Sequence, residues 1–203
     1  RRGTAHADPA RLENVTVGAT DLSESFRAGL SPHLSHVRRV ADPFHVVRVA
    51  NRCLDNVRRR VQNETLGHRG RKHDPLYRIR KLLLSGAERL DEPGADRMLL
   101  GLRVGDPNNE LLGAWLAKES VRDVYLANRW RDARTFLDKT IVGCLADDVP
   151  EIVSLGNTLK SCRREILAHP STGASTGPTE GLHLCVKNVQ RRGHGFRYVE
   201  HHR

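Results

Sequence analysis

The stretch VRRVADPFHVV (residues 37–47) predicts a strand that runs directly into a helix. Its first half is rich in β-branched residues, which favour strands. Asp42 and Pro43 then form a helix-start signal, because a carboxylate accepts from the first free N–H groups and proline sacrifices no bond at the first helical position. We therefore expect Asp42 to cap a helix that begins at Pro43. His45 follows one turn later, where its imidazole can approach the Asp42 side chain.

A second strand-to-helix junction precedes this one. Residues 15–20 form a short β-type run, and Asp21 follows with Glu24 three residues later, a spacing typical of a capping box. A strand, a short helix and a second strand over residues 37–41 predict a parallel pair in an α/β sheet. Each strand then delivers an aspartate, Asp21 or Asp42, at its carboxyl end, which is the edge where α/β sheets place ligands and chemistry.

The centre of the chain is predicted to be helical from its apolar periodicity. A long helix from Pro43 is marked by apolar residues at three- and four-residue steps, namely Val46, Ala50, Leu54, Val57 and Val61. Four further helices are predicted at residues 75–90, 109–127, 132–145 and 149–168. No strand pattern interrupts them, so we expect an all-helical block within an α/β chain, with Trp115 and Trp130 in its core.

The charge balance points to a polyanionic partner. The net charge is +10, from 34 Lys and Arg against 24 Asp and Glu. Nucleic acid fits better than a membrane surface, because no helix is both basic and strongly apolar on its other face. A glycine-punctuated basic loop over residues 63–75 is a candidate phosphate contact, although a solvated basic loop fits its composition equally well. The candidate DNA-binding side chains are Arg58, Arg59, Arg69, Arg71, Lys72, Lys187, Arg191 and Arg192.

Neither a membrane segment nor a cysteine framework is evident from the sequence. No apolar run approaches the roughly 20 residues that cross a bilayer, and no signal-peptide pattern is present, so we expect an intracellular protein. Cys53, Cys144, Cys162 and Cys185 lie far apart without a Cys-x-x-Cys pair, which excludes a zinc finger or ribbon. We expect all four to be reduced thiols that contribute to packing.

A third acidic residue stands at the start of a late helix. The small-residue linker 170–177 leads to Pro178, and Glu180 falls in the first turn that follows, where the helix dipole favours a carboxylate. Asp21, Asp42 and Glu180 therefore each stand at a helix start, which a capping role explains. Carboxylates brought together at a sheet edge also hold Mg²⁺, and two such ions about 4 Å apart promote phosphoryl transfer.

Four segments carry a resemblance to a known family. They are TDLSESFR (residues 20–27), VADPFHVVRVANRCLDNVRRRVQNETLGHRGRK (40–72), GPTEGL (177–182) and GHGF (193–196). Together they resemble the ISL-three family of bacterial insertion-sequence transposases, which are DDE enzymes with an RNase H-like core. The resemblance implies Mg²⁺- or Mn²⁺-dependent cleavage and transfer of DNA strands, with transposon ends and target DNA as partners. It also implies a cytoplasmic, nucleoid-associated protein without a membrane partner, and a homo-oligomer assembled on DNA.

The resemblance assigns roles to the acidic residues. Asp21 matches the second of three acidic residues in the family, Glu180 matches the last, and Asp42 with His45 matches a structural Asp-x-x-His motif. In the alternative placement, Asp42 is the second catalytic aspartate and Asp21 only caps a helix. The family's first acidic residue has no counterpart in these 203 residues, so we expect a fragment that is inactive by itself.

The predicted fold class is α/β, with a partial RNase H-like core of parallel strands and helices that carries a large all-helical insertion. Residues 1–62 are expected to form part of the core, and residues 63–170 the helical insertion with its basic loop. Residues 171–203 are expected to complete the core with the basic helix that bears Glu180. The alternative function is a non-catalytic, basic, helical DNA-binding protein whose acidic residues are all helix caps.

Overall fold

The computed structural model describes residues 13–20 and 35–177. Strands β1 (Val17–Thr20) and β2 (Arg38–Ala41) pair in parallel, with Val17 opposite Arg38 and Thr20 opposite Ala41. The predicted parallel pair is therefore confirmed. The helix predicted between the strands lies outside the described residues, and a wider RNase H-like core around the pair stays a prediction.

The long helix α3 (Pro43–Leu66) begins where the sequence predicts. The backbone N–H of Phe44 donates to Asp42 Oδ1 at 2.8 Å, so Asp42 is the expected helix cap. The helix ends at Gly67, whose φ of 71° lies in the left-handed region and whose N–H bonds the Asn63 carbonyl at 2.9 Å. The basic loop is shorter than predicted, because its first four residues continue α3.

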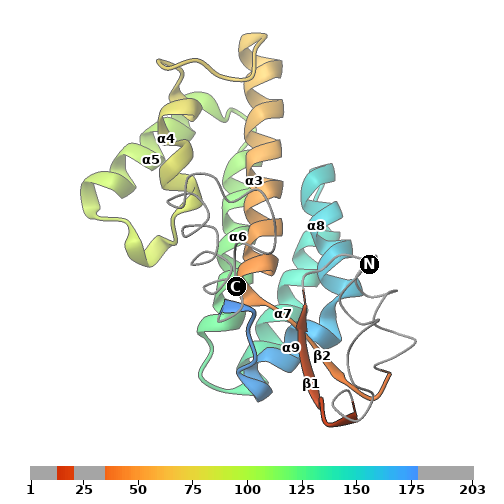
Figure 1. Cartoon of the computed structure of the whole chain (residues 1–203). Coiled ribbons are helices and arrows are strands. Elements are labelled where there is room, and N and C mark those ends of the chain that lie inside the picture. Colours follow the sequence, from red (N-terminus) through yellow and green to blue (C-terminus); the bar gives the residue numbers. More distant parts are fainter. Residues whose placement is uncertain (1–12, 21–34, 178–203) are drawn as a thin grey trace, which may run out of the picture.

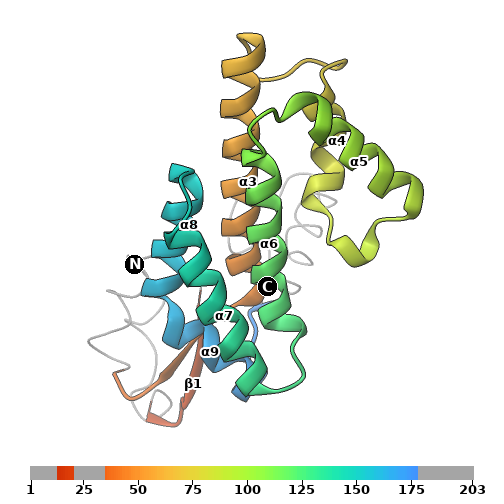
Figure 2. The same cartoon turned by 180° about the vertical axis from the view of Figure 1, so that it is seen from behind.

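The remaining helices build a body around α3. They are α4 (Pro75–Leu84), the 3₁₀ turn η1 (Ala87–Arg89), α5 (Glu92–Gly105), α6 (Glu110–Leu126), α7 (Trp130–Leu145), α8 (Pro150–Ser161) and α9 (Arg163–Thr172). Helix α3 contacts α4, α6, α8 and α9 directly, while α5 packs on α4 and α7 packs on α6 and α8. Helix α6 lies beside α3, with α7 and α8 on one side and the α4–α5 pair projecting on the other (Figures 1 and 2). Helix α9 crosses β2, so the small sheet is packed against the helical body.

Two predicted helices have different boundaries in the structure. The segment predicted at residues 75–90 ends as an α-helix at Leu84, and α5, which was not predicted, follows after η1. The segment predicted at residues 149–168 is two helices divided at Cys162. Ser161 Oγ donates to the Thr158 carbonyl at 2.9 Å, and such local side-chain bonds compete with the next helical turn.

One arginine joins three helices of the body. Arg60 of α3 contacts Glu110 at 2.5 Å and Glu151 at 2.8 Å, which stand in the first turns of α6 and α8. Both carboxylates also lie at the positive ends of their helix dipoles. The Arg60 hydrogen bonds lower the pKa of Glu151, so the pair stays ionised.

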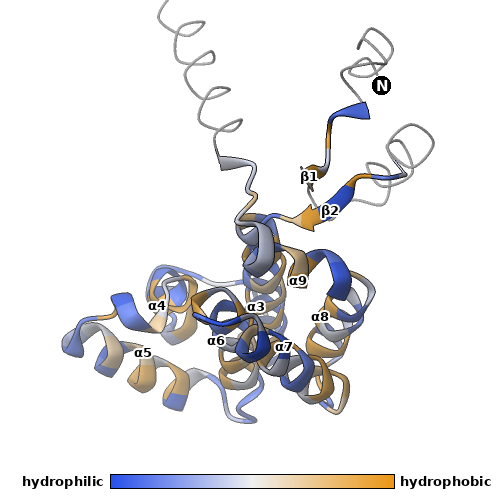
Figure 3. Ribbon diagram, turned by 90° about the horizontal axis from the view of Figure 1, so that it is seen from below, coloured by the Kyte–Doolittle hydropathy of each residue, from blue (hydrophilic) through white to orange (hydrophobic). Residues whose placement is uncertain are grey.

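A single apolar cluster runs from Ala41 in β2 to Leu167 in α9. Figure 3 shows that β2 is hydrophilic where it begins and apolar where it meets the helices. The domain division at residues 1–62, 63–170 and 171–203 stays a prediction, and α3 crosses its first boundary without a break. Trp115 packs against the cluster as expected, but Trp130 is 41% exposed, so its assignment to the core is wrong.

The described residues also bear on the membrane and cysteine predictions. Within residues 13–20 and 35–177, no helix has the length and apolar character needed to cross a membrane. Cys53, Cys144 and Cys162 are buried free thiols, as expected. Burial is the main cause that raises the pKa of Cys53 to about 12, which keeps this thiol protonated at neutral pH. Cys185 lies outside the described residues.

Candidate active site

The carboxyl ends of β1 and β2 define the edge at which the sequence places its acidic residues. Thr20 and Ala41 are paired across the two strands, and the next residues along the chain are Asp21 and Asp42. Asp42 is almost fully buried, with 2% of its surface exposed. Asp21 lies outside the described residues, so its metal-binding role stays a prediction.

The Asp42 carboxylate collects four hydrogen bonds. Oδ1 accepts from the N–H of Phe44, and Oδ2 accepts from Ser175 Oγ at 3.0 Å, Thr176 N at 2.5 Å and Thr176 Oγ1 at 2.7 Å. These partners come from the start of α3 and from the loop after α9. We call Asp42, Ser175 and Thr176 the Asp42 clasp, because one side chain ties this loop to the sheet edge.

The hydrogen bonds of the clasp favour the ionised carboxylate. Burial by itself opposes ionisation of Asp42, but the bonds from Thr176, Phe44 and Ser175 outweigh it, and the pKa of Asp42 falls below its ordinary value of 3.8. Charge-assisted bonds of this kind are about twice as strong as neutral ones. At neutral pH the ionised Asp42 therefore holds the loop after α9 against the edge of the sheet.

A second contact holds the last turn of α9 against β2. Arg38 Nη2 donates to Ser171 Oγ at 2.8 Å, next to the end of α9. The His169 ring stacks edge-on against Tyr125, with ring centroids 5.5 Å apart. Burial lowers the pKa of His169, although the negative charge of Asp42 acts in the opposite direction. A neutral imidazole therefore supports this end of α9 at neutral pH.

The described residues contain no group of three metal-ligating side chains close enough to hold a metal ion. Both carboxylate oxygens of Asp42 accept hydrogen bonds, and the alternative in which Asp42 is the second catalytic aspartate stays a prediction. His45 is half-buried in the first turn of α3, with its ring edge-on to Phe44 at 5.5 Å. Glu180 lies outside the described residues, so any site that it shares with Asp21 stays a prediction.

The predicted DNA-binding side chains differ in their exposure. Arg58 is only 5% exposed and bonds Asp55 and Gln62 within α3, so it does not face solvent as a DNA-binding side chain would. Arg58 follows Leu54 by four residues and so shares the inward face of the helix. Arg59 is exposed and pairs with Asp55 at 2.6 Å. A buried guanidinium already bonded within its own helix is a poor candidate for a phosphate contact.

The basic loop after α3 does present its charges to solvent. Arg69, Arg71 and Lys72 are all exposed. The Asp74 carboxylate accepts from the backbone N–H of Arg71, which fixes the turn before α4. This exposure is compatible with phosphate contact, and DNA binding by these three residues stays a prediction. Lys187, Arg191 and Arg192 lie outside the described residues.

Sequence reasoning missed the partners of Asp42. Ser175 and Thr176 belong to the small-residue linker. The local sequence of a linker does not predict which distant group its hydroxyls will bond. The usable signal was the run of serines and threonines immediately before Gly177 and Pro178, since such residues readily bond carboxylates as well as backbone.

Comparison with known proteins identifies the family. The model of a transposase family, the DDE transposases of the ISL3 type, matches residues 4–203. Two curated proteins from two strains of Mycobacterium tuberculosis, each named transposase for insertion sequence element IS1557, are 29% identical to the chain over 207 residues. The match covers 92% of this chain and 46% of each relative, so the chain spans about half the length of these relatives. No solved structure shows a significant match.

The family match covers nearly the whole chain, including both strands, the Asp42 clasp and every described helix. It also agrees with the resemblance carried by the segments around Asp21, Asp42 and Glu180. The chain belongs to the ISL3 family of DDE transposases.

Proposed function

We propose that this chain contributes two metal-binding carboxylates, Asp21 and Glu180, to a transposase active site that cuts and joins DNA strands. In this proposal the Asp42 clasp is the scaffold that brings them together. The observation that carries the proposal is the set of bonds from Ser175 and Thr176 to Asp42, because it fixes the approach to Glu180 at the edge where β1 ends.

Chain connectivity limits how far the two carboxylates can lie from the clasp. Asp21 directly follows Thr20, whose partner Ala41 directly precedes Asp42. Glu180 follows Thr176 by four residues, a span of at most about 14 Å for an extended chain. This short connection is compatible with two carboxylates that meet at one edge of the sheet, although they are 159 positions apart in the sequence.

The hydrogen bonds of Asp42 support the first of the two placements. A carboxylate has about four lone-pair sites, and Asp42 accepts three hydrogen bonds at Oδ2 and one at Oδ1, so few sites are left for an ion. We therefore assign Asp42 a structural role and keep Asp21 as the second acidic residue of the family.

The donor set suits Mg²⁺ or Mn²⁺. These ions favour a few carboxylate oxygens together with waters and phosphate oxygens. When bound, such ions activate an attacking oxygen and stabilise the leaving oxygen of a phosphodiester. The residues of this chain would fix the positions of the two carboxylates. Since the family's first acidic residue has no counterpart among these residues, we expect the 203 residues alone not to cut DNA.

The test joins the chain to a transposase segment that supplies the family's first acidic residue. The joined protein is expected to cut the ends of its element in the presence of Mg²⁺ or Mn²⁺. Glu180→Gln removes the charge and one metal-binding oxygen, so it should abolish cutting while DNA affinity stays unchanged. Glu92→Gln, which alters an exposed carboxylate on α5, is the matched control and should leave both unchanged. Cutting that survives Glu180→Gln would refute the assignment.

The second candidate is a non-catalytic DNA-binding protein. The observation in its favour is that Asp42 acts as a helix cap and as the acceptor of the clasp, roles that a protein without a metal site also uses. This candidate predicts DNA affinity that falls with salt and does not respond to metal ions. Mn²⁺ titration separates the two, since only the catalytic proposal predicts binding of the ion that is lost in Glu180→Gln.

A further inference from the structure

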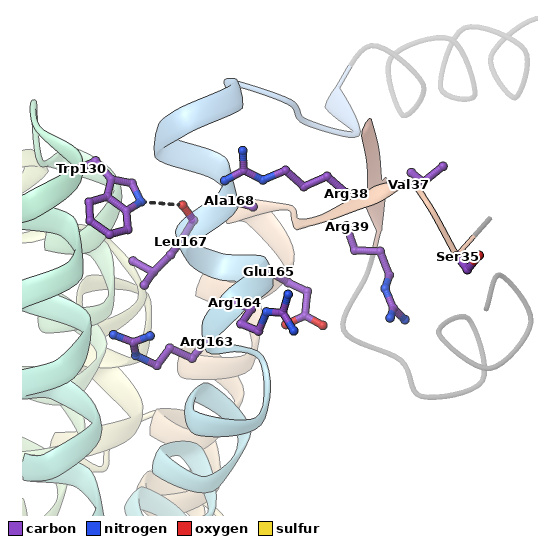
Figure 4. A pocket seen from close by; sticks show the side chains of 10 residues that line it. All are labelled: Ser35, Val37, Arg38, Arg39, Trp130, Arg163, Arg164, Glu165, Leu167 and Ala168. Carbon is purple, nitrogen blue, oxygen red and sulfur yellow. Dashed lines mark hydrogen bonds between the residues drawn. The ribbon is translucent and has the colours of Figure 1, made fainter. Parts of the chain in front are cut away.

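A basic groove lies between the start of β2 and helix α9, apart from the Asp42 clasp. It encloses a cavity of about 510 Å³, and four arginines line it, two from β2 and two from the first turn of α9 (Figure 4). They are Arg38, Arg39, Arg163 and Arg164, and we call this feature the arginine groove. Glu165 is the one carboxylate that lines the described part of the groove.

Two of the four guanidinium groups are available for an outside partner. Arg38 bonds Ser171, and Arg163 forms a two-pronged pair with Asp138 at 2.6 and 2.8 Å. Arg39 and Arg164 have no hydrogen bond or ion pair to any described residue. The groove therefore holds more positive charge than its own carboxylates neutralise.

The position of Arg163 and Arg164 is unfavourable for the stability of the helix. The first turn of a helix carries a partial positive charge, so arginines there are repelled, whereas acidic residues would be stabilised. Cys162 precedes this turn and provides no side-chain cap, which leaves backbone N–H groups of α9 to add to the same positive region. Arg163 is paired with Asp138, whereas Arg164 has no described partner and adds its charge to this positive region.

Apart from the arginines, Glu165 and Ser35, the residues that line the groove are apolar. The Trp130 indole Nε1 donates to the Leu167 carbonyl at 3.2 Å, which holds the ring at one wall while 41% of the residue stays exposed (Figure 4). Val37 and Ala168 complete this surface. Guanidinium forks suit phosphate oxygens, and a flat apolar wall suits the sugar between two phosphates.

We propose that the arginine groove binds the sugar–phosphate backbone of DNA, with Arg39 and Arg164 as the main phosphate contacts. The contact is separate from the candidate active site, because Asp42, Ser175 and Thr176 do not line the groove and lie beyond the opposite end of α9. A ten-residue helix is about 15 Å long, so DNA held here touches the protein at a distance from the cutting edge. The inference rests on the proposed function for the identity of the anion as DNA.

The test measures the affinity of the 203-residue chain for a duplex of about 30 base pairs by fluorescence anisotropy, with EDTA present. The double variant Arg39→Gln, Arg164→Gln should bind about tenfold more weakly at low salt. The slope of log affinity against log salt should fall by about 1.8, or roughly 0.9 for each lost phosphate contact. The matched control is Arg97→Gln, Arg103→Gln, which removes the same charge from exposed positions on α5 and should change affinity less than about threefold.

Each outcome decides the proposal. Equal losses in the two double variants would show that binding follows net charge alone, and an unchanged affinity of the groove variant would exclude the site. Poly-glutamate that displaces DNA at equal charge would identify an acidic protein as the ligand, which also overturns the proposal. If the double variant is unstable, two other variants replace it. The double variant Arg39→Lys, Arg164→Lys is expected to keep its DNA affinity, and the single variant Arg164→Gln is expected to lose affinity. Because no metal is present, the result does not depend on whether Glu180 supports cutting.

Discussion

At Asp42, one carboxylate joins segments that are 134 positions apart in the chain. It caps α3 through Phe44 and holds the loop after α9 through Ser175 and Thr176. A buried carboxylate with four donors is stable only while it is charged, because the protonated form loses charge-assisted bonds. Two consequences for stability follow from this residue.

The first prediction concerns the charge of the clasp. Asp42→Asn keeps the shape of the side chain but leaves only one good acceptor for the four donors, so the free energy of unfolding should fall by about 1–3 kcal/mol. Asp91→Asn is the matched control, because Asp91 caps α5 through a single bond to Gly94 and asparagine caps a helix equally well. Urea unfolding measures both variants. Equal, small effects would mean that the bonds to Ser175 and Thr176 contribute little.

The next prediction concerns how the stability that Asp42 contributes changes with pH, measured by comparing wild type with Asp42→Asn. The pKa of Asp42 is lower in the folded state than in the unfolded state, where it is near 3.8, so the unfolded chain binds more protons in the interval between them. The stability that Asp42 contributes is therefore complete above pH 3.8 and is lost as the pH falls through the folded-state pKa. The difference in unfolding free energy between wild type and Asp42→Asn should stay constant at neutral pH and shrink in acid. If the difference in unfolding free energy stayed constant into strong acid, the charge of Asp42 would not be the source of its stabilising bonds.

Residue-scale features were predictable where they depend on neighbours in the chain. The helix cap at Asp42 could be read from the proline that follows it. The burial of Arg58 could have been read from its four-residue spacing from Leu54, but its charge suggested an outward position. The bonds from Ser175 and Thr176 had no local signal, since the sequence does not state which distant carboxylate a hydroxyl will meet.

At the scale of elements, α7 and α8 cross at a glycine. A Cβ atom added to Gly156 would lie 2.8 Å from Cys144 Cβ and 3.2 Å from the Leu145 side chain, whereas one added to Gly143 on α7 would meet nothing within 4 Å. The two glycines therefore separate helix propensity from close packing.

The third prediction uses this pair. Gly156→Ala should lower the free energy of unfolding by about 1–3 kcal/mol, because an overpacked helix crossing forces the backbones apart. Gly143→Ala should raise it by about 0.5–1 kcal/mol, because alanine is the better helix former and the position is open. Thermal or urea unfolding of the two variants gives both values. A stabilising Gly156→Ala would show that α7 and α8 are not in contact as described.

The ends of helices were easier to predict where capping residues, proline or glycine mark them. Helix α3 has a cap and proline at one end and Gly67 at the other, and its start was predicted correctly. Helix α5 begins with the same kind of signal at Asp91 and Pro93 but was not predicted, and Gly94 in its first turn weakens the helical pattern there. The division at Cys162 was missed because the apolar spacing continues across it, with Leu159 in α8 and Ile166 in α9 both buried.

At the scale of the whole molecule, the sequence predicted a parallel pair and a helical block, and both are present. The way in which the helices pack could not be predicted, because apolar periodicity states which face is buried and not what covers it. Two features could not be predicted for this reason, namely the projection of the α4–α5 pair and the packing of α9 against β2. The arginine groove is likewise visible only once β2 and α9 lie together.

The central claim is that Asp21 and Glu180 form one metal site at the carboxyl edge of the sheet, held there by Asp42. The most direct measurement is the position of Mn²⁺ in crystals of this chain, located by its anomalous scattering. We expect Mn²⁺ to be bound by the carboxylates of Asp21 and Glu180, with Asp42 still bonded to Thr176. Mn²⁺ bound by Asp42 would contradict the account, and so would carboxylates of Asp21 and Glu180 too far apart for a pair of ions about 4 Å apart to join.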